Sequence, residues 1–132
     1  MEKEKNFKEW NSMKEGIHNR RDESPVYFHE REIWWCRLGI NIGFEQDGKG
    51  DESSRPVLIL KKINKHIFLA VPLSTKIKQN PYYVIYLDSR MQERSAIISQ
   101  IRLVSAKRLM RKMEQISDMA FNGIKKAIKD MF

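Results

Sequence analysis

The pattern of apolar and polar positions changes twice along the chain. The first segment, residues 3–20, carries a single apolar stripe of Phe7, Trp10, Met13 and Ile17, spaced by three or four residues. This spacing places the four side chains on one face of a helix. We therefore predict an amphipathic helix that lies on the rest of the protein or against a partner.

From residue 32 onwards, the apolar residues gather in short runs rich in aromatic and branched side chains. Polar connections bearing Gly, Pro or Asn separate these runs, which is typical of a small antiparallel sheet or barrel. About five strands are predicted, over residues 32–38, 56–62, 66–72, 82–87 and 95–104.

The C-terminal tail returns to helical spacing. Its apolar residues between Leu109 and Met131 can share one face, so one continuous helix is possible. Ser117 and Asp118 also form a good helix start, because serine caps free N–H groups and an acid favours the positive helix end. We prefer a helical turn near 105–109, a link or short strand, and a helix from about 118 to 131.

Composition limits the class of protein. The 132 residues are enough for one domain with one core, and apolar runs shorter than ten residues cannot cross a membrane. The N-terminus has no apolar signal segment, and Cys36 is the single cysteine, so a cytoplasmic location is expected. The three histidines share no ligand spacing, so we expect neither a metal site nor a cofactor.

The net charge of +8 is unevenly distributed. Residues 1–24 are neutral, whereas residues 25–132 contain nineteen basic and eleven acidic side chains. A basic domain favours a polyanionic partner, either nucleic acid or an acidic protein. A basic surface that serves only solubility is the alternative.

Three polar groups stand at the ends of predicted strands. Each has a plain structural explanation, as a solvated loop, a local turn or an exposed strand face. Together they could bind phosphate, because a guanidinium is a planar donor fork and hydroxyls add donors without charge. The groups are Glu45, Gln46 and Arg55; Ser74, Thr75 and Lys76; and Ser99, Gln100 and Arg102.

Nucleic acid could be held by further residues near these groups. Lys49, Lys76 and Lys78 could extend the positive field along a strand of nucleic acid. Tyr82, Tyr83 and Trp34 or Trp35 could stack on bases if they are exposed. For the two tryptophans, we expect a place in the core instead.

Three segments in order resemble the MazF/PemK-type toxins of bacterial toxin–antitoxin systems. They are "EIWWCRLGINIGFEQDGKGDESSRPVLIL", "VPLSTKIK" and "IISQIRLVSAKRL", and the similarity spans roughly residues 32–131. The resemblance implies an α+β fold that is mainly β, an SH3-like antiparallel barrel with a C-terminal helix. We expect residues 31–132 to form this barrel domain and residues 1–30 to form a helical extension and linker.

The resemblance also implies a function. Such toxins are metal-independent endoribonucleases that cut single-stranded RNA, with attack by the 2′-hydroxyl and release of 2′,3′-cyclic phosphate and 5′-hydroxyl ends. They act as homodimers, an acidic antitoxin neutralises them, and operator DNA is bound only by the toxin–antitoxin complex. The alternative is a relative of the same fold that binds nucleic acid or targets gyrase without cleaving RNA.

By position, the resemblance gives roles to four residues. Arg55 matches the catalytic arginine, which would stabilise the phosphorane, and Ser74 matches a threonine that is catalytic in several members. Thr75 follows it, and either hydroxyl could bind the scissile phosphate. Glu45 matches an acid that could take the 2′-hydroxyl proton or hold Arg55. Gln46, Lys49, Lys76, Lys78, Gln100 and Arg102 are the expected RNA-binding residues.

The chain departs from the family pattern in three places. Ser74 stands where threonine is usual, and Ser99 stands where some members have an acid. The segment "DGKGDESS", residues 47–54, is longer than the shortest form of this loop. Because its glycines allow conformational freedom, we predict a flap that closes over RNA and that the antitoxin displaces or reorders; a solvated loop is the alternative.

Overall fold

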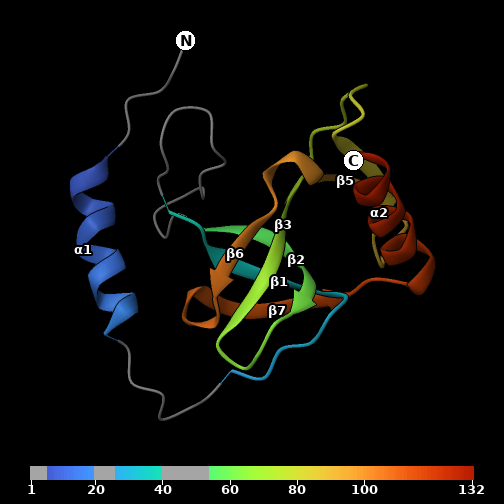
Figure 1. The fold of residues 1–132 in the computed structure, drawn as a ribbon. Coiled ribbons are helices and arrows are strands. Elements are labelled where there is room, and N and C mark those ends of the chain that lie inside the picture. Colours follow the sequence, from blue (N-terminus) through green and yellow to red (C-terminus); the bar gives the residue numbers. More distant parts are fainter. Residues whose placement is uncertain (1–5, 20–25, 40–53) are drawn as a thin grey trace.

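The computed structural model describes residues 6–19, 26–39 and 54–132. In this part of the chain, seven strands are flanked by one helix at each end (Figure 1). The helical elements are α1 (Phe7–His18), the short 3-10 turns η1 (Ile98–Gln100) and η2 (Ala106–Arg108), and α2 (Asp118–Asp130). The strands are β1 (Glu32–Arg37), β2 (Ser54–Lys62), β3 (Ile67–Ser74), β4 (Tyr83–Leu87), β5 (Glu93–Ile97), β6 (Arg102–Ser105) and β7 (Leu109–Gln115).

All strand pairs are antiparallel, and the sheet curls strongly into a barrel-like shape (Figure 1). The strand order is β4-β5-β3-β2-β1-β7, and β6 pairs with the other part of β3. The predicted fold class, mainly antiparallel β with a helix at each end, is confirmed. None of the described helices is long and apolar enough to cross a membrane.

The single strand predicted over residues 95–104 is wrong, because η1 divides it into β5 and β6. Both pieces pair with β3, but Leu73 lies opposite Ala96 whereas Ala70 lies opposite Arg102. The chain therefore advances six residues from Ala96 to Arg102 while β3 advances only three, from Ala70 to Leu73. The three surplus residues form η1, and its buried Ile98 keeps the apolar pattern of a strand.

The tail contains a strand, β7, where we expected either a link or a short strand. The turn near 105–109 and the helix from 118 are confirmed as η2 and α2, and β7 fills the link between them. Ser117 caps α2, since its Oγ accepts a hydrogen bond of 3.1 Å from the N–H of Ala120. A continuous helix is thereby excluded.

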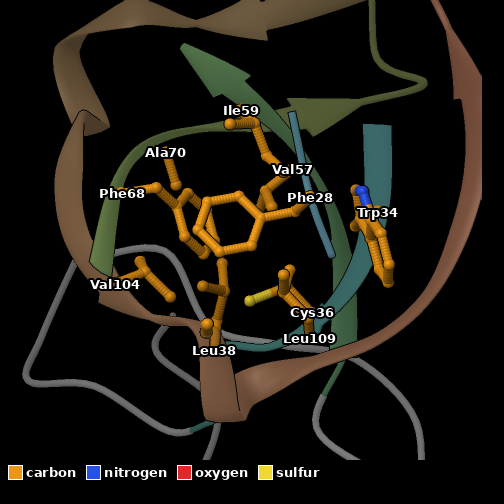
Figure 2. Packing of buried hydrophobic residues seen from close by; sticks show 11 residues of the cluster. Phe28, Trp34, Cys36, Leu38, Val57, Ile59, Phe68, Ala70, Val104 and Leu109 are labelled. Atoms are coloured by element: carbon orange, nitrogen blue, oxygen red, sulfur yellow. The ribbon is translucent and has the colours of Figure 1, made fainter. Parts of the chain in front are cut away.

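Two apolar clusters hold the fold together, one on each face of the central strands. Successive residues of β2 alternate between them: Val57 and Ile59 belong to the first cluster, and Leu58 belongs to the second. The first lies inside the curl of the sheet and includes Phe28 and Cys36 (Figure 2). The second joins the sheet to Phe121 and Ile124 of α2. Because β2 is buried on both faces, its sequence reads as a continuous apolar run.

Cys36 is a buried core residue, as the alternation in its strand predicted. It has no exposed surface, and burial raises the pKa of its thiol to about 12. A thiol that remains protonated is a poor nucleophile.

Helix α1 docks where β1 ends and η2 begins. Trp10 of α1 is buried, and its ring lies 2.0 Å from where a Cβ at Gly39 would stand. Gly39 also has a φ of +76°, so glycine is required there for both space and backbone conformation. Arg108 of η2 stacks over the Trp10 ring at 5.7 Å, and the Nζ of Lys107 donates to the carbonyl of His18 at 2.8 Å.

Candidate functional site

A pocket of about 750 Å³ opens where β2 begins and β3 ends. In the antiparallel pair, Val57 lies opposite Pro72, so the first residues of β2 lie beside the last residues of β3. Arg55, Ser74 and Thr75 all line this pocket. The structure thus brings together three of the four residues predicted to be catalytic, from positions about twenty residues apart in the sequence.

Arg55 is held within the fold and does not extend into solvent. It is 7% exposed, it lies opposite Cys36 in the sheet, and its Nη1 donates to the carbonyl of Leu73 at 3.0 Å. Burial lowers the local dielectric and strengthens the field of a guanidinium. A phosphate that entered the pocket would therefore meet a fixed positive charge.

A buried serine fixes the segment that carries the two hydroxyl residues. Ser95 of β5 lies opposite Ser74, has no exposed surface, and its Oγ donates to the carbonyl of Lys76 at 2.6 Å. The Oγ of Ser74 accepts a hydrogen bond from the N–H of Lys76 at 3.1 Å. Ser95 was not among the predicted site residues, although a serine inside an apolar strand is a recognisable sign of a buried polar contact.

The floor of the pocket is apolar and aromatic. Ile33, Trp35, Pro56 and Met113 line it. Trp34 is buried in the first cluster as expected, whereas the expectation that Trp35 fills the core is wrong, because Trp35 faces the pocket and is only half-buried. The guanidinium of Arg111 lies over the Trp35 ring at 5.4 Å.

A second wall of the pocket consists of the turn that joins β4 to β5 and of Arg94 in β5. The Oδ1 of Asp88 accepts hydrogen bonds of 2.9 Å from the N–H groups of Arg90 and Gln92, and its Oδ2 lies 3.3 Å from the Nε of Arg94. The N–H of Ser89 donates to Glu114 of β7 at 3.0 Å, which ties the turn to the sheet. This ordered wall was not predicted from the sequence.

The contacts within this turn also lower the pKa of Asp88. The hydrogen bond from Gln92 is the largest influence that lowers the pKa of Asp88; burial opposes it, and the contacts from Arg90 and Arg94 add to it. Asp88 is therefore ionised near neutral pH and holds Arg94 as an ion pair.

The other predicted residues lie elsewhere. Lys76 and Lys78 are exposed on the segment after β3, and the Nζ of Lys78 lies 4.9 Å from the centre of the Tyr83 ring. Gln100 in η1 and Arg102 in β6 do not line the pocket. Glu45, Gln46, Lys49 and all of the predicted flap except Ser54 lie outside the described residues. Within the described ranges, no group of three or more His, Cys, Asp and Glu side chains could hold a metal ion.

A family model of PemK-like, MazF-like toxins of type II toxin–antitoxin systems matches residues 29–132. Comparison with curated proteins gives no match.

Several solved structures share the fold. MazF from Deinococcus radiodurans superposes with a TM-score of 0.62 at 13% identity, over 80% of this chain and 97% of that one. An endoribonuclease in complex with its cognate antitoxin, from a mycobacterial species, gives 0.58 at 17% identity, over 79% of this chain and 93% of that one. The Mycobacterium tuberculosis toxin MazF-mt6 gives 0.57 at 16% identity, with 76% and 94% covered.

Proposed function

Since the chain belongs to the PemK-like, MazF-like toxins of type II toxin–antitoxin systems, we propose that it is an endoribonuclease toxin that cleaves single-stranded RNA without a metal ion. The strongest support for this is that buried Arg55 lines the same pocket as Ser74 and Thr75. A cation and two hydroxyls around one cavity match the charge and donor needs of a phosphate diester.

In the proposed reaction, the ribose 2′-oxygen attacks the adjacent phosphorus while the bond from phosphorus to the 5′-oxygen breaks. A base takes the proton of the 2′-hydroxyl, and the leaving 5′-oxygen gains a proton, which gives 2′,3′-cyclic phosphate and 5′-hydroxyl ends. Arg55 would stabilise the charge that develops on the phosphorane. Ser74 or Thr75 would donate to its oxygens, and Glu45 would either take the 2′-hydroxyl proton or hold Arg55 in place.

The charge of the chain supports the proposed partners. The excess of basic residues suits both an RNA strand and an acidic antitoxin segment that competes with RNA for the same surface. We further propose that the toxin works in the cytoplasm as a homodimer, with residues 31–132 as the barrel domain and residues 1–30 as an accessory segment. Operator DNA would be bound only together with the antitoxin.

The test uses a pool of single-stranded RNA incubated with purified protein in excess EDTA. We expect cleavage at a limited set of sequences, with cyclic phosphate and 5′-hydroxyl ends identified by mass spectrometry. A folded protein that leaves the pool intact would contradict the proposal. RNA or DNA binding without cleavage, or DNA breaks that depend on gyrase, would support a binding or gyrase-targeting toxin of this fold.

A further inference from the structure

The pocket is larger than a phosphate group requires. Arg55, Ser74 and Thr75 occupy one wall, whereas an aromatic floor and an ordered turn make up the rest of its roughly 750 Å³. A nucleotide bound through its phosphate has a base attached, and that base must lie somewhere near this wall. The floor and the turn are the parts of the pocket able to receive it.

Trp35 gives the floor the chemistry of a stacking platform. Its strand neighbours Trp34 and Cys36 point into the core, so alternation turns Trp35 toward the pocket. In the sheet, Pro56 lies opposite it on one side and Arg111 on the other. A base can stack on an indole ring or on an arginine plane.

Arg94 gives the second wall a fixed donor. Its Nε is held by Asp88 at 3.3 Å and its Nη2 donates to Gln92 at 2.9 Å, so the guanidinium plane has one preferred orientation. These contacts use the N–H of Nε and one N–H of Nη2, which leaves one N–H of Nη1 and one N–H of Nη2, side by side, for a ligand. A guanidinium held in this way pairs best with two adjacent acceptors, and among the bases guanine presents them as O6 and N7.

The charge of this wall favours a base over a second phosphate. Arg90 and Arg94 line it together with Asp88 and Glu114, so two cations face two carboxylates. A phosphate there would approach both acids, whereas a neutral base would not. The wall that holds Arg55 and the two hydroxyls lacks this balance among its described lining residues.

We propose that Trp35 and Arg94 form a nucleobase subsite beside the scissile phosphate: Trp35 stacks on the base, and Arg94 reads the O6 and N7 edge of guanine. The subsite rests on the proposed endoribonuclease function. It makes Trp35 and Arg94 the residues that determine which nucleotide borders the cut.

The test measures binding separately from cleavage. A short single-stranded DNA containing one guanine lacks the 2′-hydroxyl, so the proposed reaction cannot cut it. We expect it to bind and to change the tryptophan fluorescence. Replacing its guanine by 7-deazaguanine, which lacks the N7 acceptor, should weaken binding to the wild type at least about 5-fold. Arg94→Gln should bind both DNAs with equal, reduced affinity.

Two tryptophan variants test the platform. Trp35→Phe keeps an aromatic ring and should retain most of the affinity, whereas Trp35→Leu should lose about 5- to 100-fold. Melting temperatures confirm that each variant folds. In RNA cleavage, Arg94→Gln should relax the preference for guanine at one position beside the cut and leave the nature of the product ends unchanged.

Failure of the subsite differs from failure of the proposed function. Equal binding of guanine and 7-deazaguanine by the wild type, or unchanged binding in Trp35→Leu, would overturn the subsite even if the protein cleaves RNA. If the wild type cleaves no RNA but discriminates the two DNAs through Arg94, the subsite stands and the endoribonuclease proposal falls.

Discussion

The two walls of the pocket hold an arginine in different ways. Arg55 is buried and donates to the backbone carbonyl of Leu73, whereas Arg94 is half-buried and is held by the side chains of Asp88 and Gln92. A backbone contact inside the sheet fixes position as rigidly as the sheet itself. Connecting segments generally vary more in sequence than the strands they join, and both partners of Arg94 lie in such a segment. This difference suits chemistry at the first wall and recognition at the second.

The largest effect should come from the first wall. Arg55→Lys keeps the positive charge but loses the planar fork, so we expect RNA cleavage to fall about 10²- to 10³-fold, with Arg55→Ala lower still. Single-turnover rates at saturating RNA measure this loss. Arg31→Ala is the matched control, because Arg31 also donates to a backbone carbonyl, that of Ile116, but does not line the pocket. An equal loss in Arg31→Ala would mean that stability explains both variants.

A smaller loss of cleavage should follow when the hydrogen bond that holds the segment after β3 is removed. Ser95→Ala removes the hydrogen bond that the buried Ser95 hydroxyl donates to the Lys76 carbonyl, which should lower the free energy of unfolding by about 0.5–1.5 kcal/mol. The segment with Ser74 and Thr75 would then be less well placed, and cleavage should fall about 10-fold. Urea unfolding and cleavage rates test this together. Ser99→Ala, at an exposed serine in η1, should change neither quantity.

The smallest effect should be the loss of stability at low pH when Asp88 of the second wall becomes protonated. Because the pKa of Asp88 is lowered in the fold, its carboxylate contributes stability above the pKa of the unfolded chain, and this contribution is lost as pH falls through the folded value. Asp88→Asn keeps an oxygen for the N–H groups of Arg90 and Gln92 but removes the ion pair with Arg94. The wild type should therefore melt slightly above Asp88→Asn near pH 6, and the gap should close below about pH 4. A gap that does not change with pH would contradict this role.

Local patterns predicted the first wall well. Arg55 and Ser74 are carried by strand ends that pair in a simple antiparallel sheet, so the sequence order was sufficient to bring them together. The sequence pattern also predicted the capped start of α2 at Ser117. The role of Glu45, as the base or as a partner of Arg55, and the flap remain predictions, because Glu45 and all of the flap except Ser54 lie outside the described residues.

The rest depended on contacts between distant residues. The sequence left open whether a link or a strand occupies the position of β7, because Leu109 and Met113 have helical spacing. The pairing of β7 with β1, which settles this, joins residues more than seventy positions apart. Arg94 became a candidate only once Asp88 and the pocket were seen around it. Trp35 and Trp34 are adjacent in sequence, and only the sheet decides which of them faces the pocket.

If this pocket cleaves RNA as proposed, the ribose 2′-hydroxyl beside the scissile phosphate is indispensable. The most direct test is a DNA oligonucleotide with the preferred cut sequence and a single ribonucleotide on the 5′ side of the scissile phosphate, incubated with the protein in EDTA. We expect one cut, directly after that ribonucleotide, with a 2′,3′-cyclic phosphate, and no cut when Arg55 is replaced by Ala. Cleavage of the all-DNA strand, or an intact strand under conditions in which the all-RNA version is cut, would contradict it.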